Sequence, residues 1–399
     1  MDSRRKFIGT MAGGLATTFA SQTVLSANER VRIGIIGAGA RGVELARWVT
    51  ACSNVQVAAA ADVYTKSLEN VQQLIPNARV CRDYRRLLDD KTIDAVAIAT
   101  PPHLHAAQFI DSLAAGKHVY QERTMAFNVE HAKRMRDAYR NAGRQTVQVG
   151  HQACSSGHLK DASDFLAGGK VGKITVIHMR SFRNTPHGKP HWSRPVYPSM
   201  SADEIAWDAF LGDAPRRDFD ANRFVNWRLF TDYSGGSVHE NMSQQLAFWY
   251  RALGLQIPDM VNMSGGTYLW RDGREVPDTM NVALEQPEHM LITWDSGFGN
   301  GQLGTTEDVL GTDGTIARGQ AIRYLPQKVN RPDGVEILGR STTAPAAHLQ
   351  NFADCIRSGR EPSCSFDLGY RVSIACAMAI ESYRLGRSVR WDRVREEIV

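Results

Sequence analysis

Three glycines have the spacing of a turn that binds a dinucleotide. Gly37, Gly39 and Gly42 form the pattern G-x-G-x-x-G directly after the apolar run Ile33 to Ile36. In such a turn the first glycine allows a sharp bend, the second lets the backbone approach a pyrophosphate, and the third lets the next helix pack closely on the strand. The N-terminus of that helix presents unpaired N–H groups to the phosphates. We therefore predict cofactor contacts at Gly37, Gly39, Ala40 and Arg41.

Asp62 indicates which dinucleotide the turn would hold. It lies twenty residues after Gly42, at the end of a second apolar run, Val55 to Ala61. At a strand tip, a carboxylate accepts hydrogen bonds from both hydroxyls of the adenosine ribose and repels a 2′-phosphate. We therefore predict that Asp62 binds NAD rather than NADP. The alternative is a glycine-rich turn of some other α/β protein.

Alternating strands and helices position these residues. The all-apolar run Ala95 to Ala99 is typical of a parallel strand that is covered on both faces. We predict a Rossmann NAD-binding domain over residues 28–150. Ligands of such sheets bind beyond the carboxyl ends of the strands. This rule selects as cofactor neighbours Thr100, Pro101, His105 and Glu122, and as a substrate neighbour His151.

The second part of the chain has a different pattern. Strand-like segments such as Met260 to Thr267 and His289 to Thr293 are separated by glycine-rich turns, and Tyr370 to Leu385 returns to helix. We predict an α+β domain over residues 151–399, with a largely antiparallel, open-faced sheet that supplies the substrate pocket. The predicted fold class is therefore α/β, with an N-terminal Rossmann domain and a C-terminal α+β domain.

Residues 1–27 resemble an export signal. Arg4 and Arg5 stand in a twin-arginine-like sequence, before a Gly/Ala/Thr-rich stretch that is too short to span a membrane. We predict a signal peptide over 1–27 and a periplasmic protein exported folded; the alternative is a cytosolic N-terminus. The formal charge is +5, and no dense Lys/Arg block follows residue 6, which argues against nucleic-acid binding. Six cysteines without a C-x-x-C pair are expected to be reduced.

Several motifs together resemble the glucose-fructose oxidoreductase, inositol dehydrogenase and rhizopine-catabolism family, Gfo/Idh/MocA. The resemblance covers most of residues 30–390 and includes the secreted subgroup with twin-arginine signals. It implies hydride transfer to or from a nicotinamide and, by analogy only, a homodimer or homotetramer. Besides the glycine turn, its motifs are residues 99–106 (ATPPHLHA), 115–119 (AGKHV), Trp207-Asp208 with Leu211-Gly212, and 232–236 (DYSGG).

The sequence departs from that family at two motifs. The family usually has Glu-Lys-Pro after the fifth strand and Gly-Gly-x-x-x-Asp-x-x-x-His in the second domain, where the lysine and histidine handle the hydroxyl proton. Here the first motif is Glu122-Arg123-Thr124, and the second places Glu240 at the acid and Gln244 at the histidine. Arg123 can hold an oxyanion or carboxylate but is no base, and Gln244 does not titrate. Without the proline that readily takes a cis peptide, we expect the turn to be rebuilt.

Another group must therefore move the proton, or the redox step is slow or absent. His239 is the best substitute because its intrinsic pKa suits proton transfer near neutrality; the alternative is a packing role. Glu240 follows the family's acid position, and Tyr233 either donates to a sugar hydroxyl or fills the domain junction. The predicted catalytic residues are Arg123, His239, Glu240 and Tyr233.

Histidines and aromatic residues of the second domain give two further predictions. His178, His187 and His191 cannot share a helical face and have no acidic residue between them, so we predict no metal site. Aromatic and arginine side chains more plausibly form a pocket wall, with a buried aromatic core as the alternative. These wall residues are Trp192, Arg194, Trp207, Trp227 and Arg228. The predicted substrate contacts are Arg123, His151, Trp192, Trp207 and Gln244.

These observations predict an NAD-dependent oxidoreductase that acts on a carbohydrate or polyol at a ring carbinol carbon. Outside the cytoplasm free NAD is scarce, so we expect a tightly held cofactor that is recycled. Two alternatives stay open: a glycoside hydrolase that oxidises its sugar transiently and eliminates the aglycone, and a redox-silent sugar-binding protein.

Overall fold

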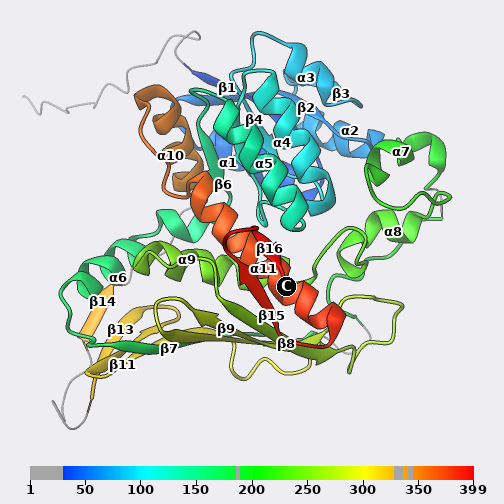
Figure 1. Cartoon of the computed structure of the whole chain (residues 1–399). Coiled ribbons are helices and arrows are strands. Elements are labelled where there is room, and N and C mark those ends of the chain that lie inside the picture. Colours follow the sequence, from blue (N-terminus) through cyan, green and yellow to red (C-terminus); the bar gives the residue numbers. More distant parts are fainter. Residues whose placement is uncertain (1–29, 186–188, 199, 328–335, 340–344) are drawn as a thin grey trace, which may run out of the picture.

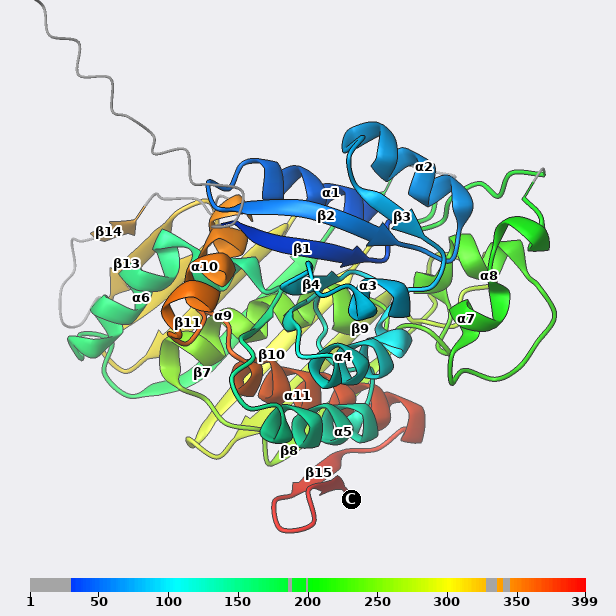
Figure 2. The same cartoon turned by 90° about the horizontal axis from the view of Figure 1, so that it is seen from above.

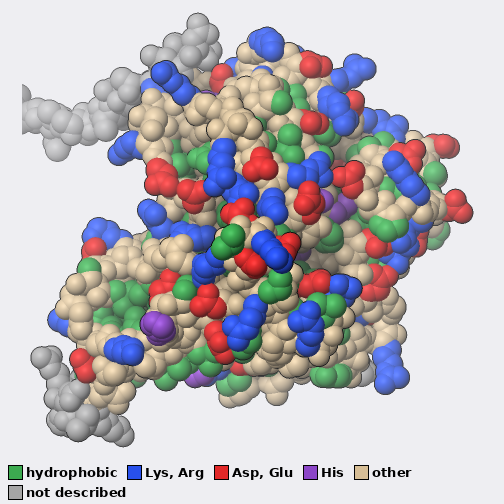
Figure 3. Space-filling view, in the orientation of Figure 1, with side chains coloured by type: hydrophobic (Ala, Val, Ile, Leu, Met, Phe, Trp, Pro, Cys, Tyr) green, Lys and Arg blue, Asp and Glu red, His purple; other side chains and the backbone are tan. Residues whose placement is uncertain are grey.

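The structure is a computed structural model that describes residues 30–185, 189–198, 200–327, 336–339 and 345–399. The predicted signal peptide and His187 lie outside these residues. Charges of both signs are interspersed over the face shown in Figure 3. In the described residues, no helix has the length and apolar character that crossing a membrane requires. All six cysteines are free, and four of them are buried.

The N-terminal half forms a parallel sheet in the order β3-β2-β1-β4-β5-β6. The chain order reverses between β1 and β4, and ligands of open parallel sheets bind at such a reversal. The strands are short and mostly buried because helices cover both faces. They are β1 (Val31–Ile36), β2 (Val55–Ala61), β3 (Arg79–Cys81), β4 (Ala95–Ile98), β5 (His118–Gln121) and β6 (Val147–Val149).

One of the covering helices comes from the far end of the chain. Helix α10 packs beside α1 (Figure 1), where Leu349 and Phe352 join Ile33 and Leu45 in one buried cluster. The C-terminal region thus returns to the first domain. The helices of this domain are α1 (Ala40–Thr50), α2 (Thr65–Leu74), α3 (Arg85–Asp89), α4 (His105–Ala114), α5 (Val129–Asn141) and the returning α10 (Pro345–Ser358).

The second half forms a ten-stranded sheet in the order β14-β13-β12-β11-β7-β10-β9-β8-β15-β16. All neighbours are antiparallel except β7 and β10, which are parallel. The strands are β7 (Ile174–Phe182), β8 (Met260–Gly266), β9 (Thr279–Gln286), β10 (Met290–Gly297), β11 (Thr305–Gly311), β12 (Gly314–Arg318), β13 (Ile322–Pro326), β14 (Glu336–Gly339), β15 (Val389–Asp392) and β16 (Glu397–Ile398).

Three helices lie between this sheet and the first domain (Figure 1): α6 (Gly157–Ala167), α9 (Ser243–Leu253) and α11 (Phe366–Leu385). None of the described helices covers the opposite face of the sheet (Figure 1). Buried and partly exposed residues alternate along β7, as expected for a sheet with one open face. The predicted fold class, a Rossmann domain followed by an α+β domain, is confirmed.

A lobe of the second half, which we define as residues 189–198 and 200–232, reaches across to the first domain. It contains α7 (Trp207–Leu211) and α8 (Ala221–Val225) and lies beside α2 in both views (Figures 1 and 2). Two contacts attach it there: Tyr64 forms a bridge with Ile205, and Ala206 N donates to Val63 O at 2.9 Å. The lobe therefore covers the edge of the Rossmann domain at which β2 ends.

Candidate active site

A pocket of about 900 Å³ lies between the glycine turn and the lobe. This volume is within the range of sites that bind cofactors and other small ligands. The first domain contributes Gly37 to Arg41, Asp62, Thr100 and Pro101 to its wall. The lobe contributes, among others, Arg194, Tyr197, Phe210, Trp227 and Arg228. Seven of the nine predicted cofactor contacts therefore line one cavity.

Each glycine of the turn meets a different steric demand. Gly37 has φ +92°, and a β-carbon there would lie 2.9 Å from the backbone of Thr100. A β-carbon at Gly42 would overlap the carbonyl oxygen of Gly37, whereas one at Gly39 would have no atom within 4 Å. Helix α1 starts after Gly39 without a side-chain cap, so its first N–H groups are open to a ligand. The turn fits a diphosphate.

Asp62 is held rigidly at the tip of β2. Its Oδ2 accepts from Ala38 N at 2.6 Å and its Oδ1 from Tyr64 N at 2.8 Å. Burial raises the pKa of Asp62 to about 6, although both backbone hydrogen bonds favour the ionised form. Each carboxylate oxygen retains a second lone pair for a ribose hydroxyl. Tyr64, which we did not single out from the sequence although it follows the same strand end, lines this part of the pocket.

His105 supports the pocket from behind. Its side chain is fully buried, with Nε2 2.9 Å from Thr100 O and Nδ1 2.9 Å from Thr124 O. The ring thus connects the loop after β4 to the turn after β5. The Arg123–Thr124 peptide bond in that turn is cis, so our expectation of a rebuilt turn is wrong. His105 does not line the pocket, which leaves structural support as its assignment.

Glu122 likewise lies outside the pocket lining. Its carboxylate accepts from Arg41 Nε at 2.8 Å and from Arg123 N at 3.1 Å, and the side chain is buried. Arg41 also binds Glu44 and lies over the Trp48 ring, with 4.5 Å from its guanidinium carbon to the ring centroid. The pair therefore ties the first turn of α1 to the end of β5.

A second group of polar side chains occupies one face of the helix that starts at residue 238. Its first turn, Val238–Met242, is π-helical, a geometry often found at functional sites, and α9 continues it. Between residues 236 and 250 only Glu240, Asn241 and Gln244 are not buried. These three side chains therefore form the open face of the helix.

Each of the three accepts a hydrogen bond from an arginine of a different segment. Arg228 Nε donates to Glu240 at 3.0 Å, and Arg183 Nη2 donates to Asn241 Oδ1 at 3.1 Å. With its amide oxygen turned toward the guanidinium, Gln244 accepts from Arg123 Nη2 at 2.7 Å and Nε at 2.6 Å. Arg228 also lines the nucleotide pocket, so the pocket and the helix face are contiguous.

Glu240 and His239 have opposite surroundings. Burial disfavours the Glu240 carboxylate, but Arg228 and Arg123 outweigh burial and lower its pKa, so it is ionised at neutral pH. His239 is buried, its Nδ1 accepts from Gly235 N at 2.9 Å, and burial lowers its pKa to about 4. A neutral imidazole on the buried side of the helix does not reach the open face. His151 is also fully buried, and burial, then Arg123, lowers its pKa well below 6.5.

The predicted aromatic and arginine contacts divide into two groups. Tyr233 is buried, with its ring centroid 5.1 Å from that of Phe210, and Trp207 stacks on the same Phe210 at 5.1 Å. Trp192 packs on Phe298 at 5.5 Å. These three side chains belong to the packing of the lobe and its junction, as in the alternative of a buried aromatic core. Three of the predicted wall residues do line the pocket: Arg194, Trp227 and Arg228.

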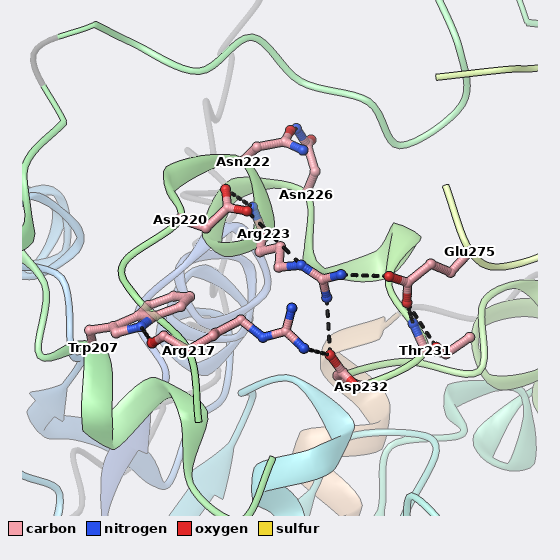
Figure 4. A network of polar contacts seen from close by, with 9 residues as sticks. All are labelled: Trp207, Arg217, Asp220, Asn222, Arg223, Asn226, Thr231, Asp232 and Glu275. Atoms are coloured by element: carbon pink, nitrogen blue, oxygen red, sulfur yellow. Dashed lines mark hydrogen bonds and ion pairs between the residues drawn. The ribbon is translucent and has the colours of Figure 1, made fainter. Parts of the chain in front are cut away.

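Ion pairs fix the lobe in place (Figure 4). Asp232 accepts from Arg217 at 2.5 Å and from Arg223 at 3.0 Å, and Arg223 also donates to Glu275 at 2.5 Å. Glu275 lies in the segment between β8 and β9, so its bond with Arg223 joins the lobe to the sheet, whereas Asp232 holds two segments of the lobe together. The side chain of Asn226 both accepts from and donates to the Arg194 backbone, at 2.7 and 3.0 Å. Sequence reasoning missed this network because its members have no common motif.

No group of three potential metal ligands occurs in the described part of the chain. His178 contacts Thr293 Oγ1 at 2.7 Å within the sheet, and His191 packs against Trp192 with 4.7 Å between ring centroids.

Comparison with known proteins identifies the class. Residues 31–151 match the model of the Gfo/Idh/MocA oxidoreductase family, NAD-binding Rossmann fold. The chain is 30% identical over 372 residues to inositol 2-dehydrogenase of Acidothermus cellulolyticus, covering 92% of this chain and 96% of that enzyme. It is also 30% identical to 1-carboxy-3-chloro-3,4-dihydroxycyclohexa-1,5-diene dehydrogenase of Comamonas testosteroni, but over only 38% of each chain.

Solved structures show the same fold. A levoglucosan dehydrogenase in complex with NADH and levoglucosan superimposes with a TM-score of 0.70 at 18% identity, covering 90% of this chain and 99% of the other. The chain therefore belongs to the Gfo/Idh/MocA family of NAD-binding oxidoreductases. Membership confirms the prediction of NAD as the cofactor and of an oxidoreductase as the class of protein.

Proposed function

We propose that this oxidoreductase acts on a carbohydrate or polyol, at a ring carbinol carbon. One observation carries the proposal: Arg228 lines the nucleotide pocket and also binds Glu240, so the polar helix face begins where the pocket ends. The names of an inositol dehydrogenase and a levoglucosan dehydrogenase among its relatives support a polyhydroxylated substrate.

We assign the transfer of the hydroxyl proton to residues of the open helix face. The glycine turn and Asp62 would hold NAD, which would supply the acceptor for the hydride of the carbinol carbon. Ionised Glu240 accepts the hydrogen bond of the substrate hydroxyl and takes its proton. The positive charge of Arg123, on the same helix face, stabilises the negative charge that develops on this oxygen. We assign the proton to Glu240 rather than to His239, because His239 is buried behind the open face. On the same ground we assign Tyr233 and Trp207 to packing.

The lobe supports our proposal that a recycled cofactor is tightly retained. Its residues form one wall of the pocket, and the hydrogen bond from Arg223 to Glu275 joins it to the rest of the second domain. A nucleotide held this way leaves only after the lobe moves. Recycling requires that one sugar be oxidised and another, or the same one, be reduced on the same bound nucleotide.

Nucleotide release and spectroscopy test the function. Purified protein is denatured and the released nucleotide is identified by mass; we expect NAD. Candidate sugars are then added to the native protein, and absorbance in the NADH band is expected to rise. Release of an aglycone without net NADH would instead establish the hydrolase alternative. Sugar binding with neither signal would establish the redox-silent binding protein.

Export is a separate proposal that rests on residues 1–27 alone. We propose that the twin-arginine route carries the folded protein, with its nucleotide, to the periplasm. Substituting Arg4 and Arg5 by lysine should retain the protein in the cytoplasm, as measured by cell fractionation. Periplasmic protein at the wild-type level in that variant contradicts this proposal and leaves the enzymatic one intact.

A further inference from the structure

The open helix face carries an unbalanced positive charge. Three guanidinium groups bind it, from Arg123, Arg183 and Arg228, but Glu240 is its only carboxylate. Glu240 is paired with Arg228. Arg123 and Arg183 bind the neutral amides of Gln244 and Asn241, and neither has an acidic partner within 4 Å in the described part of the chain. Only Arg228 is therefore paired directly with a carboxylate, and the three positive charges of this face exceed its single negative charge.

These two arginines bind the same helix face, and both reach solvent. Asn241 and Gln244 are three residues apart on one helix face, so their side chains adjoin. Arg183 is exposed and Arg123 is partly exposed, although both are fixed by hydrogen bonds. Arg183 further acts on His191: burial first, then the charges of Arg183 and Arg274, lower the pKa of that imidazole to about 4. His191 is therefore neutral and adds no positive charge, and Arg274 is neutralised by Asp272 at 2.8 Å.

A neutral sugar does not require this arrangement. Hydroxyl groups are satisfied by amides and single charges, whereas two forked guanidinium groups match the oxygens of a carboxylate. Glu240, the carboxylate of the same helix face, is already bound by Arg228, which offsets part of its repulsion of an incoming anion. We propose that the substrate is a sugar acid whose carboxylate binds between Arg123 and Arg183 while Glu240 receives the reacting hydroxyl. This inference rests on the proposed function and specifies its substrate class.

Matched pairs of sugars test the proposal on the purified full-length protein with its bound nucleotide. Glucuronate and gluconate are compared with glucose. Glucose 6-phosphate tests whether the site prefers a phosphate to a carboxylate. We expect kcat/KM at least about tenfold higher for an acid than for glucose, with a KM for the acid that rises with salt. Calorimetry measures binding of the same four compounds independently of turnover.

Arg183→Gln separates charge recognition from chemistry. It removes a cation that binds only Asn241, and we expect kcat/KM for the acid to fall about 10- to 100-fold, since hydrogen bonds to charged groups are the strong ones. The loss in kcat/KM for glucose should be smaller than the loss for the acid, because glucose has no carboxylate to bind. Arg183→Lys keeps the charge without the fork and should give an intermediate loss. Arg216→Gln is the control: the Arg216 side chain is 67% exposed on the lobe surface, so kcat/KM should stay unchanged for both the acid and glucose.

Each result bears on one of the two proposals. If glucose and the acids are turned over equally, and Arg183→Gln changes neither rate, the sugar-acid inference is overturned. The oxidoreductase function then still stands. Preference for glucose 6-phosphate overturns the assignment of a carboxylate. Binding of an acid that Arg183→Gln abolishes, without any NADH signal, supports the inference and overturns the redox function. Failure of every acid to bind or react also overturns the inference.

Discussion

Asp62 links nucleotide binding to pH through its raised pKa. Burial raises that pKa to about 6, against about 4 for an unperturbed aspartate. Relative to the unfolded chain, the nucleotide-free protein therefore favours the protonated carboxyl, although the carboxylate predominates above about pH 6. The stability that protonated Asp62 contributes to the folded state is therefore fully present below about pH 4, and it is lost as pH rises through about 6. A ribose diol donates hydrogen bonds and prefers the ionised form, so NAD binding has the opposite dependence.

We predict that the NAD affinity of nucleotide-free protein falls as pH drops below about 6, by up to about tenfold per pH unit. Calorimetric titration between about pH 5 and pH 8 measures this change in NAD affinity. Asp62→Asn cannot ionise, and it should bind NAD weakly at every pH without this slope. A wild-type affinity that is constant over the whole range contradicts the role of the Asp62 carboxylate.

At the scale of one element, the strand-turn-helix unit β1–α1 depends on a glycine that lies inside a helix. Alanine normally stabilises such a position, but a β-carbon at Gly42 overlaps the carbonyl oxygen of Gly37. We predict that Gly42→Ala lowers the free energy of unfolding by about 1–3 kcal/mol and reduces NAD content. Thermal unfolding and nucleotide release measure the two effects.

The matched control for that substitution is Gly319→Ala. A β-carbon at Gly319 has no atom within 4 Å, so the change in stability should stay within about 0.5 kcal/mol. If Gly42→Ala is as stable as Gly319→Ala and keeps its NAD, the close approach of α1 to the turn is required neither for stability nor for NAD binding.

Elements with a local signature could be predicted from the sequence. The glycine turn and Asp62 could be found because their roles depend on residues nearby in the chain. The pairs on the open helix face could not be, since Arg123, Arg183 and Arg228 reach one helix from three distant segments. His239 shows the same limit. A suitable intrinsic pKa selected it, and only the fold reveals that it lies on the buried side of the helix.

On the scale of the whole molecule, the lobe controls access to the pocket. Asp232 accepts hydrogen bonds from Arg217 and Arg223, at 2.5 and 3.0 Å, and holds two segments of the lobe together. We predict that Asp232→Asn speeds release of bound NAD about tenfold or more, because charge-assisted hydrogen bonds are lost. The rate is measured with protein loaded with NADH, whose fluorescence changes when it is released into excess buffer.

Asp208→Asn is the control for the lobe. Asp208 also binds an arginine, Arg216, at 3.1 Å, but its side chain is 92% exposed, and surface pairs contribute little. Its release rate should equal that of the wild type. Equal rates in both variants would show that the lobe does not limit nucleotide release.

Helix α10 places a constraint on how the chain matures. It supplies Leu349 and Phe352 to the apolar cluster that β1 and α1 also form, yet it is translated only after strands β7 to β14 of the second half. A nascent N-terminal half therefore exposes part of this apolar cluster until α10 has been made. The nucleotide-binding half is completed only after most of the second half has been synthesised.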